Sequence, residues 1–274
     1  MANNVRLEIA GMTDPGLVRA QNEDAIAFSV AHGFAVLADG MGGYNAGEVA
    51  SSIATTVARD ILEKGLAVPV DGAEDPSIRG SQLHELLVTA IKAANSAILD
   101  AARAEPEYQG MGTTIIAAVF GRDKVTIAHV GDSRGYRFRG RELSRVTKDH
   151  SLLQEQIDAG LIDAAMARFS QSKNLVTRAV GVGTEVDVEV HDHHLEPGDL
   201  YLFCSDGLSD MLSDEEIGDI LASGQDSLEG ACQTLVARAN GSGGFDNISV
   251  VLARVRSTEA EMTGLLGRIL NWVR

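Results

Sequence analysis

The sequence is poor in cysteine and in basic residues, and it lacks long apolar runs. Two cysteines, Cys204 and Cys232, are too few for a disulfide framework, and neither has a partner at zinc-ligand spacing. Lysine and arginine number 23 against 39 acidic residues, and the resulting net charge of −16 disfavours a nucleic-acid-binding surface. No apolar stretch approaches the roughly 18 residues that a membrane-spanning helix needs. The N-terminal residues also lack a basic segment followed by an apolar core, so we expect no secretory signal and a cytoplasmic protein.

The remaining composition is that of a folded globular chain, with 274 residues of which 45% are hydrophobic. Helical periodicity predicts one helix over 45–65 and a second over 83–98, separated by a surface loop over 67–81. Apolar strand patterns occur in blocks before and after this helix pair. Such grouping favours an α+β fold over a doubly wound parallel sheet. We predict a four-layer αββα sandwich in which two packed, mainly antiparallel β-sheets are flanked by helix pairs.

The C-terminal residues 259–274 form a separate amphipathic pattern. Their apolar residues recur at helical spacing, interspersed with Arg268 and Arg274. A helix that contacts a membrane surface or a partner is one interpretation. We favour the more common outcome, a helix packed on its own domain. The predicted organisation is therefore one domain over residues 1–258 and a helical tail over 259–274.

Acidic residues recur where apolar strand patterns begin or end. The run Phe34 to Ala38 ends in Asp39-Gly40, and another run ends in Asp206-Gly207. Each Asp-Gly pair alone is explained as a turn. Further acidic residues stand at the ends of other strand patterns, and they are harder to explain as turns: Glu23, Asp24, Asp132 and Asp246.

Carboxylates that meet in one cleft repel one another unless cations offset their charge. Ligation by oxygen alone selects hard divalent ions such as magnesium or manganese. Glycine beside an aspartate also lets a backbone carbonyl reach the same ion. The pattern predicts a carboxylate-bridged site for two metal ions roughly 3.5 to 4 Å apart.

Seven short motifs complete this pattern and occur in a fixed order. Together they resemble the metal-dependent serine/threonine protein phosphatases of the type 2C class, in their bacterial form, over about residues 5 to 255. Any one motif is weak, whereas the ordered set is highly specific. The motifs are RAQNED (19–24), DGMGG (39–43), GTT (112–114), VGDSRGY (130–136), TRAVG (177–181), SDGL (205–208) and DNISVV (246–251).

The resemblance implies a metal-binding role for five of these residues. Asp39 matches the carboxylate that bridges both metals, and the carbonyl of Gly40 matches a ligand of one of them. Asp206 and Asp246 match the remaining ligands of the other ion. Asp132 matches the residue that, with Asp206, holds a weaker third ion in bacterial relatives. The implied cofactors are two Mn²⁺ or Mg²⁺ ions per chain, with a third in some states.

The resemblance also implies roles for residues around the metals. Arg19 matches the arginine that clamps the substrate phosphate, for which its planar fork of donors is suited. Glu23, Asp24 and Asn247 fall close to the site, where they would act through water or support the ligands. Residues 150–176 match a flap segment beside the active site. We count Arg19 with the three metal-binding aspartates, Asp39, Asp206 and Asp246, as the catalytic set.

The expected reaction is hydrolysis of phosphoserine and phosphothreonine in proteins by a water activated by two metals. By family analogy, the partners would be a bacterial serine/threonine kinase or the substrates of that kinase. A catalytically silent family member is an alternative, but such proteins usually lose metal aspartates that this chain retains. A hydrolase of small phosphoesters is a second alternative.

Histidines offer a different candidate for metal binding. His191, His193 and His194 look like a cluster, but the first two continue the polar face of a strand, and we favour a solvated face. His129 alternates with apolar residues and is predicted to be a core or near-core residue. His150 stands at the entrance of the predicted flap.

Overall fold

The computed structural model describes residues 6–43, 46–67, 76–163, 175–223 and 227–256. The predicted C-terminal tail and the central part of the predicted flap lie outside these residues.

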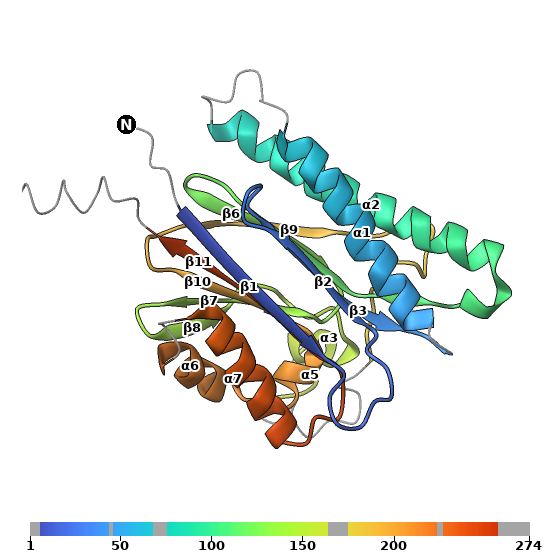
Figure 1. Cartoon of the computed structure of the whole chain (residues 1–274). Helices are drawn as coiled ribbons and strands as arrows, with labels where there is room; N and C mark the ends of the chain where they lie inside the picture. The colour runs from blue at the N-terminus through green and yellow to red at the C-terminus, as the bar shows by residue number, and fades with distance from the viewer. Residues whose placement is uncertain (1–5, 44–45, 68–75, 164–174, 224–226, 257–274) are drawn as a thin grey trace, which may run out of the picture.

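Two antiparallel sheets form the centre of the molecule (Figure 1). Sheet A has the order β1-β11-β10-β7-β8, and sheet B has the order β2-β3-β5-β6-β9, with the short β4 paired to β3. The strands of sheet A are β1 (Arg6–Asp14), β11 (Ile248–Arg256), β10 (Leu200–Cys204), β7 (Arg134–Arg139) and β8 (Glu142–Arg145). Those of sheet B are β2 (Asp24–Ser29), β3 (Phe34–Met41), β5 (Ile115–Phe120), β6 (Lys124–Val130), β9 (Glu189–His194) and β4 (Gly112–Thr113).

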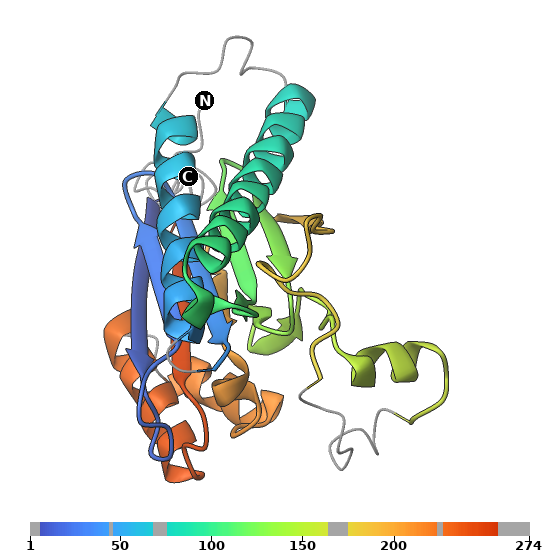
Figure 2. The same ribbon diagram turned by 90° about the vertical axis from the view of Figure 1, so that its right-hand side faces the viewer.

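Helices cover the outer face of each sheet, as Figures 1 and 2 show from two sides. The long helices α1 (Ala46–Ala67) and α2 (Pro76–Ala104) lie on sheet B, with the 3-10 turn η1 (Pro106–Tyr108) after α2. Sheet A is covered by α5 (Asp206–Ser209), α6 (Asp214–Ser223) and α7 (Leu228–Gly241). A further short helix, α3 (Leu152–Asp158), projects from the sandwich in Figure 2. The predicted αββα sandwich is confirmed.

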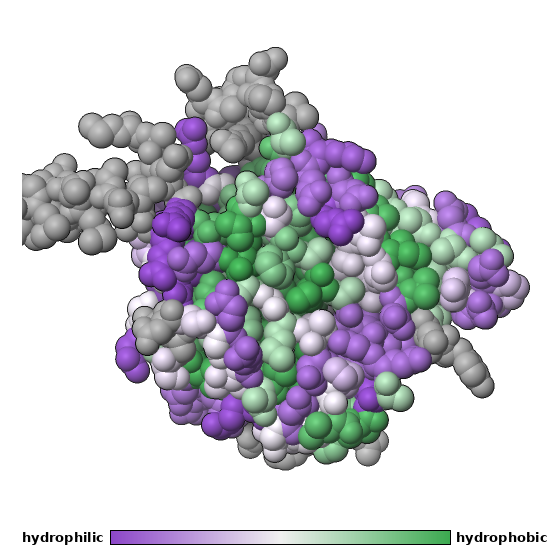
Figure 3. All heavy atoms as spheres, in the orientation of Figure 1, coloured by the Kyte–Doolittle hydropathy of each residue, from purple (hydrophilic) through white to green (hydrophobic). Residues whose placement is uncertain are grey.

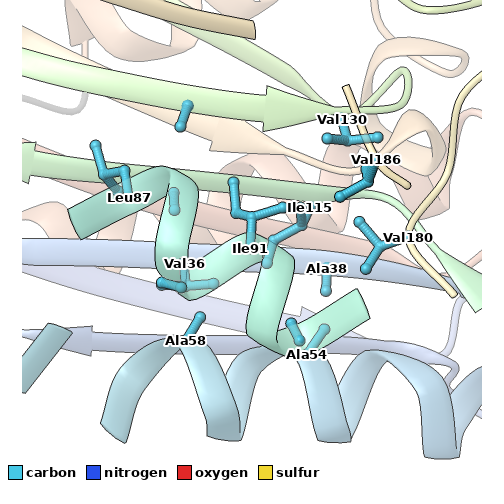
Figure 4. Packing of buried hydrophobic residues seen from close by; sticks show 14 of the residues in the cluster. Val36, Ala38, Ala54, Ala58, Leu87, Ile91, Ile115, Val130, Val180 and Val186 are labelled. Carbon is cyan, nitrogen blue, oxygen red and sulfur yellow. The ribbon is translucent and has the colours of Figure 1, made fainter. Parts of the chain in front are cut away.

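Three hydrophobic clusters hold the four layers together. One lies between sheet B and the helices α1 and α2, where small residues such as Ala54 and Ala58 let α1 approach Val36 closely (Figure 4). A second joins sheet A to its helices, and a third fills the space between the sheets with residues such as Leu37 and Phe203. The central strands β3, β5 and β11 are therefore buried on both faces, which fixes their register and the positions of their ends.

The helix boundaries differ from the sequence predictions at two places. Helix α2 begins at Pro76, so the predicted loop over 67–81 was wrong in its last residues. Proline suits the first turn of a helix because its missing N–H would have no partner there. Helix α7 was not predicted, although its buried residues Leu228, Leu235 and Val236 are apolar. None of the helices in the described part of the chain is long and apolar enough to cross a membrane.

Candidate metal centre

The antiparallel pairing of β2 and β3 brings the first two acidic residues together. Asp24 and Asp39 are directly opposite each other in the register, close enough for the Asp24 carboxylate to raise the pKa of Asp39. Asp24 is only 8% exposed, whereas Asp39 is partly open to solvent. The end of sheet B therefore presents two adjacent carboxyl groups.

Sheet A brings two more aspartates to the same region through Ser205. This residue follows β10, and its hydroxyl donates to Asp24 Oδ2 at 2.8 Å, which joins the two sheets. Its amide donates to the Ser249 carbonyl at 3.1 Å, so the end of β10 lies against the beginning of β11. Asp206 follows Ser205 and Asp246 precedes β11, so both stand at this end of the sandwich.

Hydrogen bonds from β4 and the residue after it hold the backbone of Asp39. The hydroxyl of Thr113 and the amide of Thr114 donate to the Asp39 carbonyl at 2.8 and 2.9 Å, and the Asp39 amide donates to Thr114 Oγ1 at 3.1 Å. Thr114 Oγ1 also lies 2.7 Å from Ser133 Oγ, next to Asp132. Thr114 therefore connects the segments that carry Asp39 and Asp132.

Gly40 occupies a position where no other residue fits. A Cβ atom there would lie 2.1 Å from the Gly47 carbonyl oxygen and 2.5 Å from that of Glu23. The Gly40 amide donates to the Glu23 carbonyl at 3.0 Å. The close packing brings Glu23 beside Asp39 and Gly40, which both lie in β3 rather than in a turn.

Asn247 fastens the loop that carries Arg19. Its side-chain amide donates to the carbonyls of Pro15 and Gln21 at 3.0 and 2.8 Å, and its Oδ1 accepts from the Glu23 amide at 2.8 Å. Arg19 extends from this loop and donates to Asp246 Oδ2 at 2.7 Å. The guanidinium is half-exposed, which leaves donors available to a ligand in the cleft.

The aspartates destabilise one another's charged forms. Burial and the neighbouring Asp24 and Asp206 carboxylates raise the pKa of Asp39 well above its ordinary value. Burial and the Asp132 and Asp246 carboxylates raise the pKa of Asp206 to about 8. Burial also raises the pKa values of Asp24 and Asp132 to about 6. Burial is the main cause of these shifts, and at Asp39 and Asp206 the neighbouring carboxylates add to it.

This donor set fits hard divalent cations. The Oδ1 atom of Asp24 is buried and has no hydrogen-bond partner, and the converging carboxylates require positive charge. Among the described residues, the one group whose ligand atoms all lie within 4.8 Å of one another is elsewhere and does not include Asp39, Asp206 or Asp246. Oxygen ligands of this kind are those that hard divalent cations prefer.

Two further acidic residues near the site were missed in the sequence. The carboxylate of Asp149 is, after burial, the largest cause of the raised pKa of Asp132, and Asp210 acts on both Asp132 and Asp206. Asp149 is held by Arg134, whose Nη2 donates to its Oδ2 at 2.8 Å. Neither acid stands at a strand end, so strand patterning contained no signal for them.

Comparison with known proteins places this arrangement in a family. Residues 18–239 match the family model described as protein phosphatase 2C. The serine/threonine protein phosphatase PstP of Mycobacterium tuberculosis is 38% identical over 249 residues, which cover 91% of this chain but only 45% of PstP. The serine/threonine phosphatase stp of Listeria welshimeri is 35% identical over 243 residues, covering 88% of this chain and 92% of stp.

Solved structures agree with this similarity. The crystal structure of Mycobacterium tuberculosis PstP superposes with a TM-score of 0.82 at 36% identity and covers 92% of this chain and 99% of the other. A structure of the PstP catalytic domain in complex with two manganese ions has a TM-score of 0.80 at 36% identity, covering 93% and 100%. The chain belongs to the protein phosphatase 2C family.

Proposed function

We propose that this chain is a metal-dependent protein phosphatase that hydrolyses phosphoserine and phosphothreonine. The observation that carries the proposal is the meeting of aspartates from both sheets, joined by the bond from the Ser205 hydroxyl to Asp24, where burial and mutual repulsion raise their pKa values. The family match and the manganese-containing PstP structure support the same conclusion. When bound, two Mn²⁺ or Mg²⁺ ions would supply an activated water and neutralise phosphate charge.

In this proposal each residue of the cleft has a defined task. Asp39 would bridge both ions and Gly40 would offer its carbonyl, while Asp206 and Asp246 would hold the other ion. Asp132 would hold a weaker third ion together with Asp206. Asp39, Asp206 and Asp246 are partly exposed, so they can exchange a proton or water for a cation, whereas Gly40 and Asp132 are buried.

The residues around the ligands would orient them and the substrate. Glu23 and Asp24 would act through water or hydrogen bonds, and Asn247 would hold the Arg19 loop. The Arg19 guanidinium would exchange its bond to Asp246 for the phosphate oxygens of the substrate. Arginine suits this task because its planar donors match a phosphate in two places.

The surface beside Arg19 favours a protein over a small phosphoester as the substrate. The side chains of Leu17, Val18 and Phe245 are 69%, 62% and 61% exposed. Apolar residues gather at the lower edge of the face in Figure 3, where the loop after β1 lies in Figure 1. A bound polypeptide would cover such side chains, whereas a small phosphoester would leave them in water.

The wider setting follows from the relatives named protein phosphatases. We propose a cytoplasmic enzyme whose substrates are a serine/threonine kinase or the targets of that kinase. We also propose that the phosphatase domain ends near residue 258 and that 259–274 form a separate tail.

Turnover assays test the proposal directly. The chain is incubated with a phosphothreonine peptide and with an aryl phosphate, with and without Mn²⁺. We expect metal-dependent turnover of both and loss of turnover in Asp39→Asn. Absence of turnover with metal would favour a silent binding protein, and full activity in Asp39→Asn would contradict the ligand assignment. Failure on peptides with turnover of small phosphoesters would favour the second alternative.

A further inference from the structure

A second group of metal-ligating side chains lies at the edge of sheet B, formed by His129, His150 and Glu189. One ligand atom from each residue lies within 4.8 Å of the others. His129 on β6 and Glu189 on the edge strand β9 are directly opposite in the register. His150 arrives from the loop that opens the predicted flap, and its ring stacks on that of His129 with centroids 4.7 Å apart.

The hydrogen bonds of His129 leave one ring nitrogen free to bind a metal ion. Its Nε2 donates to the Lys148 carbonyl at 2.8 Å, because a carbonyl can only accept. The neutral ring then carries its lone pair on Nδ1, and this atom is buried without a hydrogen-bond partner. Burial lowers the pKa of His129, which keeps the ring neutral. The side chain is 1% exposed, so its unpaired nitrogen is unusual for a merely structural histidine.

His150 and Glu189 are already arranged as a pair of ligands. The Gly131 amide donates to His150 Nδ1 at 3.2 Å, so the proton of this ring is on Nε2, which donates to Glu189 Oε2 at 3.1 Å. Two ligands on a tetrahedral zinc ion are about 3.3 Å apart, given bond lengths of about 2.0 to 2.1 Å. The other Glu189 oxygen lies 2.6 Å from His191 Nε2.

Glu189 and His191 connect this group of side chains to solvent. The Glu189 side chain is 29% exposed and that of His191 is 47% exposed, whereas His129 and His150 are buried behind them. His191 confirms the prediction of an exposed residue on this strand. Its place beside Glu189 also makes it an available fourth ligand.

We propose that His129 Nδ1, His150 Nε2 and Glu189 form a binding site for Zn²⁺, with His191 or water as the fourth ligand. Imidazole nitrogen favours zinc over the magnesium or manganese that an all-oxygen site selects. Zinc would replace the proton on His150 Nε2, the neutral ring would carry its proton on Nδ1 instead after exchange with solvent, and the carboxylate would offset the charge of the ion. The site is separate from the carboxylates of the candidate metal centre.

Zinc bound at this site would affect the structure of the candidate metal centre. A metal on His150 Nε2 moves the ring proton to Nδ1, which can then no longer accept from the Gly131 amide. Gly131 precedes Asp132, so loss of this bond would disturb the loop that carries the proposed third-ion ligand. The His150 carbonyl also accepts from the Thr177 amide at 2.8 Å, at the base of the predicted flap. We therefore expect zinc to lower turnover, a consequence that rests on the proposed function.

Zinc titration tests the site without any assay of activity. The full chain is saturated with Mg²⁺ to occupy the carboxylates and titrated with Zn²⁺ against a chromogenic chelator. Glu189→Gln and His129→Gln should each weaken zinc binding by more than about 100-fold, because losing even a group behind a ligand costs about 10- to 100-fold. His194→Gln changes an exposed histidine on the same strand and should leave the affinity within about twofold.

Two controls complete the design. Asp39→Asn should keep zinc binding, and Co²⁺ in place of zinc should give the absorption bands of a nitrogen-ligated tetrahedral ion that Glu189→Gln abolishes. In the active protein, Glu189→Gln should resist zinc inhibition. Unchanged zinc affinity in both site variants would overturn the proposal, as would loss of zinc binding in Asp39→Asn alone. Either result could occur in a fully active phosphatase, so it is distinguishable from failure of the proposed function.

Discussion

Replacing Asp206 by asparagine should stabilise the metal-free protein and weaken its response to metal. The buried carboxylate has a pKa of about 8 because of burial and because Asp132 and Asp246 lie near it. Asparagine keeps the shape and polarity of the side chain but removes the charge. A side chain that only stabilised the fold would not show opposite effects in the absence and presence of cations.

The magnitude follows from the pKa of Asp206. The ordinary pKa of an aspartate, 3.8, lies about 3 units below pH 7. At about 1.36 kcal/mol per unit, the raised pKa of Asp206 lowers the free energy of unfolding at pH 7 by at most about 4 kcal/mol. Relaxation around the other aspartates reduces this to about 1–3 kcal/mol, or a rise of roughly 3–8 °C in Tm. Since the folded-state pKa is raised, the cost is absent below about pH 4, grows as the pH rises and is complete above about pH 8.

Thermal and urea unfolding in chelator at pH 5, 7 and 8 would measure the effect, followed by the same series in Mn²⁺. Wild-type protein should lose stability between pH 5 and 8 in chelator and regain it with Mn²⁺. The stability of Asp206→Asn should vary less with pH than that of the wild type, and it should rise less on addition of Mn²⁺. Asp219→Asn, at an exposed position on α6, is the matched control and should behave as wild type. The reasoning fails if Asp206→Asn is no more stable than wild type in chelator.

Three further substitutions test how the site is held. Gly40→Ala should lower the free energy of unfolding by about 3 kcal/mol or more, because the new Cβ would lie 2.1 Å from the Gly47 carbonyl oxygen. Gly43→Ala is the control, because its Cβ would have no atom within 4 Å, and it should change the free energy of unfolding by less than about 0.5 kcal/mol. Asn247→Ala should lower the free energy of unfolding in urea by about 3 kcal/mol, since three part-buried hydrogen bonds of about 1 kcal/mol each are lost; a change below about 1 kcal/mol would refute the role of Asn247 in holding the Arg19 loop. Arg19→Lys should raise KM for a phosphopeptide about 10-fold with a smaller change in kcat, and an unchanged KM would exclude phosphate binding by its fork.

Strand patterning contained most of the information on the candidate metal centre. Asp39 and Asp206 follow apolar runs that indicated buried strands, so their position near strand ends was predicted. Which strand ends meet depends on the sheet order, which patterning alone does not specify. The order of the family motifs supplied that information.

Contacts between segments distant in the chain could not be predicted in this way. Asn247 bonds to Pro15 and Gln21 across 232 and 226 residues, and the local sequence carries no mark of it. The histidine group is similar, because His150 comes from a loop and joins two strands that looked merely alternating.

Anomalous scattering from crystals grown with Mn²⁺ tests the central claim most directly. Two peaks about 3.5 to 4 Å apart are predicted, with Asp39 between them and Asp206 and Asp246 on one of them. Data from well-occupied crystals with no peak at these carboxylates, or with manganese bound only elsewhere, would contradict the account.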